Sequence, residues 1–189
     1  MKKSHIFDPA HIAVLESEDR EMWQNPDKIL GAVDLQPDWI AVDLGSGSGY
    51  FTVPLSQSVK KVLAVDVQKE MLGFLRAKLQ RLGIRNIELR LSKPDKIPVE
   101  ESSVDFLMSV NTLHEFGDRD KMIGEMWRIL KKGAKLLIVD FKKEDTGFGP
   151  PVSIRVTKER AVKLFERKGF TLSKAMDLQY HYLLVFVKG

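Results

Sequence analysis

The feature that most constrains the fold is a glycine-rich segment, residues 43–50 (DLGSGSGY). It follows residues 39–42 (WIAV), a short apolar run that predicts a buried strand, and it leads into residues 51–55 (FTVPL), which can open a helix. Because glycine lacks a Cβ, each glycine allows a sharp turn with positive φ or lets a ligand lie against the backbone. A strand, a glycine turn and a helix in succession predict the start of a nucleotide-binding βαβ unit.

The spacing of the glycines excludes two common nucleotide sites. A dinucleotide loop needs G-x-G-x-x-G, but Tyr50 stands at the third glycine position in one register and Thr52 in the other. A phosphate loop needs a lysine after its last glycine, and none follows Gly49. The pattern that fits is an acidic residue, Asp43, at the end of the strand, followed by G-x-G-x-G.

Here the chain resembles the class I S-adenosylmethionine-dependent methyltransferases, whose first motif, hhDhGxGxG, is reproduced by residues 39–49. Residues 61–66 predict the next strand, which ends in Asp66, about 20 residues past the glycine loop, where a carboxylate accepts hydrogen bonds from ribose hydroxyls. A tight turn without a ligand would explain the loop alone, but not this second acid. The resemblance implies S-adenosylmethionine as cofactor, with S-adenosylhomocysteine as its product. It implies a cofactor site formed by Asp43, Gly45, Ser46, Gly47, Asp66, Val67, Ser92, Lys93 and Asn111.

The contact with adenine is where the sequence departs from its relatives. They often carry an aspartate two residues past the third strand, which residues 86–91 predict here, but this sequence has Lys93 at that place. Either Asp95 substitutes for it, or the backbone of Ser92 and Lys93 makes the contact. Residues 97–105 (IPVEESSVD) then resemble the LPFPDNSFD segment of the methyltransferases related to the ubiquinone and menaquinone enzymes.

The remaining elements predict an α/β fold. Amphipathic helices are expected at residues 68–82, at 118–131 (closed by Gly133) and from Thr157 to Gly169, and strands at 106–110, 135–141, 170–178 and 180–188. The last strand is apolar on both faces, which indicates a central place in the sheet. A terminal hairpin of this kind is typical of the methyltransferase fold. The resemblance over residues 37–189 therefore implies a three-layer α-β-α sandwich with a seven-stranded, mostly parallel sheet and one antiparallel strand near the C-terminus.

Residues 1–36 predict a helical cap on a single domain that spans residues 1–189. Asp8-Pro9 and Asn25-Pro26 are helix-start signals, each with an N-cap residue followed by proline at the first helical position. In proteins that resemble this one, such a segment is commonly a lid over the cofactor pocket. The alternative is that aromatic residues here only pack the helices onto the core. The residues of interest for a lid are His5, Phe7, His11, Arg20 and Trp23.

Two residues after the fourth strand are candidate catalytic groups. Ligands of open α/β sheets bind at the carboxyl ends of the strands, and residues 111–116 leave that end of the fourth strand. His114 is the candidate general base because imidazole titrates near neutral pH, and Glu115 is the second choice. A structural or helix-capping histidine is the alternative. The loop at residues 142–153 is long enough to be functional as well.

The acceptor is predicted from what the sequence lacks. Methylases of base amino groups or glutamine amides usually carry Asn or Asp, two prolines and an aromatic residue after the fourth strand, whereas residues 111–114 are NTLH. The resemblance therefore points away from those amino substrates, and a short chain with no added recognition domain favours a small-molecule acceptor. A methyltransferase of RNA or protein, and an S-adenosylmethionine-binding module without catalysis, are the alternatives. The absence of cysteine excludes disulfides and the thiolate-dependent methylation of pyrimidine C5 or arsenite.

Charge and hydropathy set further limits. The net charge of +4 and basic residues at helical spacing are typical of solvated helix faces, so a nucleic-acid partner is not favoured. The four histidines show no ligand spacing, so no metal site is predicted. No apolar run is long enough to span a membrane and no signal-peptide core follows Met1, so a cytoplasmic protein is expected. The sequence does not predict the oligomeric state.

Overall fold

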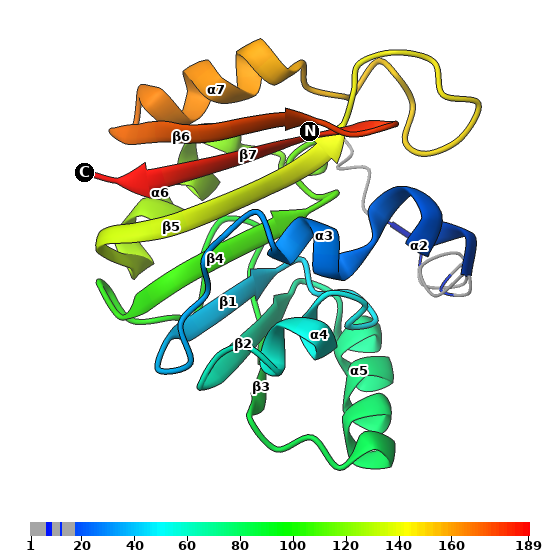
Figure 1. Ribbon diagram of the computed structural model, residues 1–189, viewed down its shortest axis with the longest axis vertical. Coiled ribbons are helices and arrows are strands. Elements are labelled where there is room, and N and C mark those ends of the chain that lie inside the picture. Colours follow the sequence, from blue (N-terminus) through cyan, green and yellow to red (C-terminus); the bar gives the residue numbers. More distant parts are fainter. Residues whose placement is uncertain (1–6, 9–11, 13–17) are drawn as a thin grey trace.

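A seven-stranded sheet forms the centre of the computed structural model, which describes residues 7, 8, 12 and 18–189 (Figure 1). Within these residues the strand order is β3-β2-β1-β4-β5-β7-β6. The pairs from β3 to β5 are parallel, and β7 pairs antiparallel with both of its neighbours, which confirms the predicted sheet. The strands are β1 (Ile40–Leu44), β2 (Lys61–Asp66), β3 (Ile87–Leu91), β4 (Val104–Val110), β5 (Leu130–Phe141), β6 (Phe170–Asp177) and β7 (His181–Lys188).

Helices cover both faces of the sheet and complete the three layers (Figure 1). On one face lie α3 (Pro26–Leu30), α4 (Thr52–Ser56) and α5 (Lys69–Leu82), and on the other lie α6 (Arg119–Ile129) and α7 (Lys158–Glu166). The helix α2 (Glu18–Gln24) lies beyond the carboxyl ends of the strands (Figure 1). Side chains of Asn25, Asp118 and Thr157 cap α3, α6 and α7, as the sequence signals predict.

The core divides between the two faces by alternation along each strand. In β2, Leu63 and Val65 pack with the core beneath α6 and α7, whereas Val62 packs beneath α3 and α4 and Ala64 packs against α5. Because both faces of these parallel strands are buried, the strands have continuous apolar sequences. The last strand, β7, follows the same rule, because His181–Phe186 are all buried.

The junction between α6 and β5 differs from the prediction. The helix was expected to continue to residue 131 and to end at Gly133, but it ends at Ile129, and β5 begins at Leu130 without an intervening loop. Leu130 is extended (φ −72°, ψ 141°) and pairs with Val104 of β4, so strand pairing begins earlier than the helical periodicity suggests. Leu82, the last residue of α5, is 49% exposed.

The topology places the site at the carboxyl ends of β1 and β4. The chain runs outward from β1 through β2 to β3, then returns to form β4 on the other side of β1. Open sheets bind ligands at this reversal, because the loops after the two central strands diverge there. No helix in the described part of the chain is long and apolar enough to cross a membrane.

Candidate active site

The glycine loop after β1 adopts the conformation that its sequence predicts. Gly45 and Gly49 have φ values of 77° and 85°. A Cβ on Gly45 would overlap the side chain of Thr112, and one on Gly49 would overlap Leu75. The N–H of Gly45 donates to the carbonyl of Val65 in the neighbouring strand at 2.8 Å. Both the backbone conformation and the available space therefore require glycine here, and the loop lies close against the ends of β1 and β2.

Two buried carboxyl groups lie beneath this loop. Burial raises the pKa of Asp43 to about 7, although a hydrogen bond from the Thr52 hydroxyl opposes the shift. Burial also raises the pKa of Asp66, whose oxygens accept the N–H groups of Gly47 (2.8 Å) and Gln68 (2.9 Å). Burial disfavours the ionised form of both carboxyl groups. A cationic ligand placed beside them would favour the ionised form and would be attracted to it.

Two buried hydroxyls, one after β1 and one after β3, line the same cavity. The side-chain oxygens of Ser46 and Ser92 are buried and have no hydrogen-bond partner among the described residues. Such groups are uncommon in folded proteins and indicate a place for a ligand or a water molecule. Asp95 also lines the cavity, whereas Lys93 lies in a separate surface groove and pairs through its backbone with Lys96. Three residues were considered for the adenine contact. Ser92 and Asp95 line the cavity, and Lys93 does not.

Asn111, at the end of β4, is held in a left-handed conformation with φ 59°. Its amide exchanges two hydrogen bonds with the amide of Gln24 in α2, both 3.1 Å long. Gln24 also accepts a hydrogen bond from Arg20 at 2.9 Å, and the guanidinium of Arg20 lies 4.2 Å from the centre of the Tyr50 ring. A strained residue at a strand end is typical of functional sites, and here it also fixes the position of α2.

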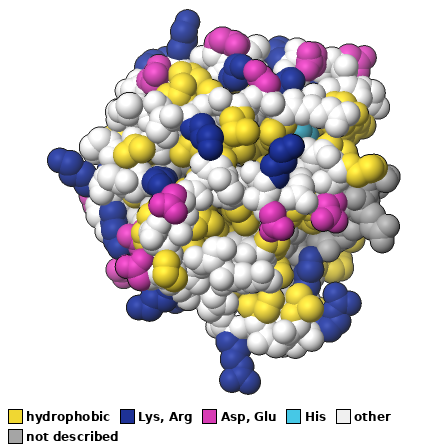
Figure 2. Space-filling view, viewed as in Figure 1, with side chains coloured by type: hydrophobic (Ala, Val, Ile, Leu, Met, Phe, Trp, Pro, Cys, Tyr) yellow, Lys and Arg dark blue, Asp and Glu magenta, His cyan; other side chains and the backbone are white. Residues whose placement is uncertain are grey.

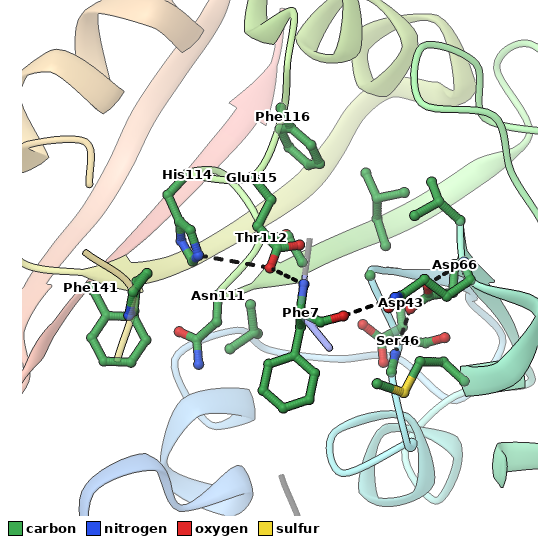
Figure 3. A pocket seen from close by; sticks show the side chains of 18 of the residues that line it. Phe7, Asp43, Ser46, Asp66, Asn111, Thr112, His114, Glu115, Phe116 and Phe141 are labelled. Atoms are coloured by element: carbon green, nitrogen blue, oxygen red, sulfur yellow. Dashed lines mark hydrogen bonds and ion pairs between the residues drawn. The ribbon is translucent and has the colours of Figure 1, made fainter. Parts of the chain in front are cut away.

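The backbone of Phe7 bridges the two sides of the cavity. Its N–H donates to Glu115 Oε1 at 3.1 Å, and its carbonyl accepts from Gln68 Nε2 at 2.9 Å (Figure 3). Glu115 follows β4 and Gln68 follows β2, so the backbone of Phe7 connects the ends of two strands. Among the residues expected in a lid, Phe7, Arg20 and Trp23 all line the cavity. His5 and His11 lie outside the described residues.

Aromatic side chains and one arginine close the far side of the cavity. Trp23 of α2 stacks on His181 of β7, with ring centres 5.3 Å apart, and contacts Phe148 at 5.4 Å. Phe148 belongs to the long loop after β5, which is organised by Arg155. The buried guanidinium of Arg155 donates to the carbonyl oxygens of Lys142, Glu144, Phe148 and Pro150 at 2.7–3.2 Å. This loop is therefore a fixed wall of the cavity.

His114 lies between two carboxyl groups. Its Nδ1 is 2.7 Å from Asp140 Oδ1, and its Nε2 is 4.0 Å from Glu115 Oε1 (Figure 3 shows the His114–Glu115 pair). Burial lowers the pKa of His114, but the charge and hydrogen bond of Asp140 outweigh burial, so the pKa lies above its usual value. Burial raises the pKa of Glu115 to about 7. Asp140, Gln24 and Arg155 were not identified from the sequence. Asp140 had a usable signal, because it is an acid near the end of an apolar strand, like Asp43 and Asp66.

The segments that follow β1, β2, β3 and β4, together with α2 and the loop after β5, line a cavity of about 920 Å³. Its volume is within the usual range for sites that bind small molecules. Lys93 is the one predicted site residue that does not line it. Those that do are Asp43, Gly45, Ser46, Gly47, Asp66, Val67, Ser92, Asn111, His114 and Glu115.

Comparison with known proteins decides the family. The model of the methyltransferase domain matches residues 42–138, more than half of the chain. The chain belongs to this methyltransferase family. A crystal structure of a SAM-dependent methyltransferase from Aquifex aeolicus is 30% identical, with a TM-score of 0.92 over 97% of this chain and 100% of that one. The resemblance inferred from the glycine loop is thereby confirmed.

Curated relatives match a smaller part of this methyltransferase. An uncharacterized methyltransferase-like protein of Schizosaccharomyces pombe is 36% identical over 108 residues, covering 57% of this chain and 40% of that protein. The ubiquinone/menaquinone biosynthesis C-methyltransferase UbiE of Wigglesworthia glossinidia brevipalpis is 31% identical over 111 residues, covering 57% and 44%. The match thus spans about two fifths of the length of these relatives.

The cavity of this methyltransferase fits S-adenosylmethionine, the cofactor of the family. Two unpartnered buried hydroxyls offer hydrogen bonds to a nucleoside, and Gly45 and Gly47 of the glycine loop line the cavity. Two carboxyl groups favour the positive charge of a sulfonium and an ammonium group. The predicted cofactor is therefore consistent with the chemistry of the residues present.

Proposed function

We propose that the protein transfers a methyl group from S-adenosylmethionine to a small-molecule acceptor, with His114 as the base that removes a proton. The observation that carries the proposal is the continuity of the cavity. It runs from the glycine loop to His114 and then to the wall formed by Trp23, Phe148 and Phe141. We call the part around residues 43–49, 66–68 and 92–95 the cofactor end, and the part around Trp23, Phe148, Phe141 and His114 the acceptor end.

The cofactor end would hold S-adenosylmethionine along its length. Asp66 would accept hydrogen bonds from the ribose hydroxyls, and Ser92 and Asp95 would contact the adenine. The backbone from Gly45 to Gly47, with Ser46, Asp43 and Asn111, would hold the methionine portion. When bound, S-adenosylmethionine supplies a methyl group already activated on a sulfonium. The main task of the protein is therefore to position the acceptor.

At the acceptor end, His114 is the group suited to proton removal. Its Nδ1 is occupied by Asp140, so the neutral ring presents Nε2 to the cavity. Glu115 lies 4.0 Å from that nitrogen and would stabilise the imidazolium that forms. A base within hydrogen-bond reach of the acceptor is worth about 10²–10⁴ in rate.

The aromatic lining of the acceptor end supports a small acceptor. Trp23 and Phe148, which contact each other, line the cavity together with Phe7. The face seen in Figure 2 has its Lys and Arg side chains scattered among Asp and Glu, without the basic stripe typical of RNA-binding surfaces. The relatives named as C-methyltransferases of ubiquinone and menaquinone biosynthesis are consistent with a small acceptor.

The decisive experiment uses S-adenosylmethionine labelled in the transferred methyl group. The protein is incubated with this compound and a cell extract, and label is counted in the small-molecule, RNA and protein fractions. We expect label among small molecules, and we expect His114→Gln to lose that transfer while keeping its affinity for S-adenosylhomocysteine. Label confined to RNA or protein would contradict the proposal. Cofactor binding without transfer to any fraction would favour a binding module.

A further inference from the structure

Asp140 lies at the carboxyl end of β5, beside the segment that carries His114. Since β4 and β5 are parallel neighbours, their carboxyl ends meet at the same edge of the sheet. The side chain of Asp140 is fully buried. One of its oxygens accepts the His114 backbone N–H at 2.9 Å. The other lies 2.7 Å from His114 Nδ1 and accepts the N–H of Phe141 at 2.7 Å.

We propose that Asp140 is a positioning residue that holds the His114 ring with its proton on Nδ1 and its Nε2 directed into the cavity. The inference rests on the proposed function, because it assigns the group that makes His114 an effective base. A carboxylate oxygen accepts but does not donate, so the ring nitrogen facing it must carry the hydrogen. The same arrangement orients the histidine in Ser-His-Asp hydrolases.

The surroundings of His114 favour a proton on Nδ1 throughout the reaction. The charged or titratable groups near its ring are Glu115 on the same segment, Arg119 of α6, Asp140 of β5 and His181 of β7, among the described residues. Arg119 donates to the carbonyl oxygens of Leu113 and His114 at 3.0 Å. It fixes the backbone of the segment while Asp140 fixes the ring. Burial lowers the pKa of His181 to about 3, so that ring is neutral and does not repel an imidazolium.

The proton transfer is balanced by the methyl transfer. The acceptor's bond to hydrogen breaks, and the proton forms a new N–H bond on His114 Nε2. The electron pair left on the acceptor forms the bond to the methyl carbon. The bond from that carbon to sulfur breaks and leaves its electrons on sulfur as a neutral thioether. The imidazolium then carries protons on both nitrogens, between Asp140 and Glu115.

The first test observes the ring directly and needs no substrate. The chain has four histidines, so ¹⁵N-labelled protein gives few imidazole signals, and His114→Gln identifies the one of interest. In the neutral ring of His114 we expect Nδ1 to be protonated and Nε2 to be unprotonated. A neutral ring protonated on Nε2 would overturn the proposal, whether or not any variant folds.

The second test uses Asp140→Asn. We expect the His114 signal to titrate at lower pH than in the wild type, because the attraction of the carboxylate is lost. We expect the transfer rate at neutral pH to fall about a hundredfold or more. Calorimetry with S-adenosylhomocysteine should show a change in Kd of less than about twofold, which separates positioning from cofactor binding. An unchanged titration and tautomer of His114 would contradict the inference.

Asp105→Asn is the matched control. Asp105 also accepts a backbone N–H, from Ile40 at 2.9 Å, but it lies near the start of β4, at the opposite edge of the sheet from His114. We expect Asp105→Asn to affect stability without changing the His114 titration. The experiment also separates this inference from the proposed function. If the wild type transfers no label but shows the expected tautomer, the proposed function fails and the orientation of His114 by Asp140 stands.

Discussion

At the cofactor end of the cavity, residues are held by main-chain contacts between neighbouring elements, whereas the acceptor end is held by side chains from distant parts of the chain. Gly45 and Ser46 donate to the carbonyl of Val65, one strand away. By contrast, Asp140 reaches His114 across 26 positions, and Trp23 stacks on His181. Local backbone geometry therefore shapes the cofactor end of the cavity, while long-range side-chain packing shapes the proposed acceptor end.

The largest effect on ligand affinity is expected from Asp66→Ala at the cofactor end. We expect affinity for S-adenosylmethionine to fall about a hundredfold, because hydrogen bonds to a charged group contribute roughly 1.5–3 kcal/mol each. Isothermal calorimetry measures the loss. Asp177→Ala, which removes an exposed carboxylate paired with Lys158, is the control and should leave affinity unchanged. Full affinity in Asp66→Ala would refute the ribose contact.

At the acceptor end, Arg155→Lys should open the loop wall. A lysine keeps the charge but cannot reach the four carbonyl oxygens that the guanidinium holds, and the opening should lower local stability by about 2–3 kcal/mol. Hydrogen exchange of residues 142–155 checks this, with unchanged binding of S-adenosylhomocysteine expected. Arg128→Lys is matched, since Arg128 also donates to backbone carbonyls, of Ile97 and Val99, away from the cavity. Equal protection of the loop in wild type and Arg155→Lys would contradict the role of Arg155.

The pH dependence of stability tests the buried carboxyl group of Asp43. Its pKa rises from an ordinary value of 3.8 to about 7, so the folded protein binds this proton more tightly than the unfolded chain. Its contribution to stability is therefore fully present below pH 3.8 and is lost as the pH rises to about 7. Asp43→Asn stays neutral, and without ligand it should be more stable than the wild type at pH 8 by about 4 kcal/mol.

Chemical denaturation at pH 4 and pH 8 measures this difference. We expect the gain from Asp43→Asn to be near zero at pH 4 and to be largest at pH 8. The same variant should bind S-adenosylmethionine more weakly at pH 8. A gain that is equal at both values of pH would mean that burial of charge at Asp43 is not its cause.

The smallest effect is expected at Phe7, where the cofactor end and the acceptor end of the cavity meet. Gln68→Ala removes the donor to the carbonyl of Phe7 but leaves the bond from Phe7 to Glu115. A single neutral hydrogen bond is worth about 1 kcal/mol, so S-adenosylhomocysteine should dissociate a few-fold faster in stopped-flow measurements. Gln80→Ala, on an exposed position of α5, should not change the rate. Equal dissociation rates in the wild type and both variants would mean that the hydrogen bond from Gln68 to Phe7 does not retain the ligand.

The sequence predicts most of the fold and nearly all of the cofactor end. Asp43, the glycines and Asp66 follow one another at fixed spacings, and each is placed by the strand that precedes it. Lys93, predicted as a cofactor contact, lies in the outer groove, where its backbone pairs with Lys96. That pairing joins residues three positions apart, and the spacing of the motifs does not reveal it.

The acceptor end was less predictable for a physical reason. The partner of His114 lies 26 positions away, and Trp23 stacks on His181 near the other end of the chain, so these contacts depend on how β5, β7 and α2 pack. Arg155 resembles any other arginine before a helix, and its role appears only when the loop folds back over it. The junction of α6 and β5 was misplaced because helical periodicity continues through Leu130, while strand pairing with Val104 ends the helix.

The position of β7 has a consequence for the order in which the chain folds. β7 follows β5 and β6 in the sequence but lies between them in the sheet. Until residues 181–188 are synthesised, β5 and β6 each present an unpaired edge, which is a template for aggregation in a nascent chain. The cofactor end, built from β1 to β3, needs none of these residues. The acceptor end receives His181 from β7, so it is completed only when the sheet itself closes.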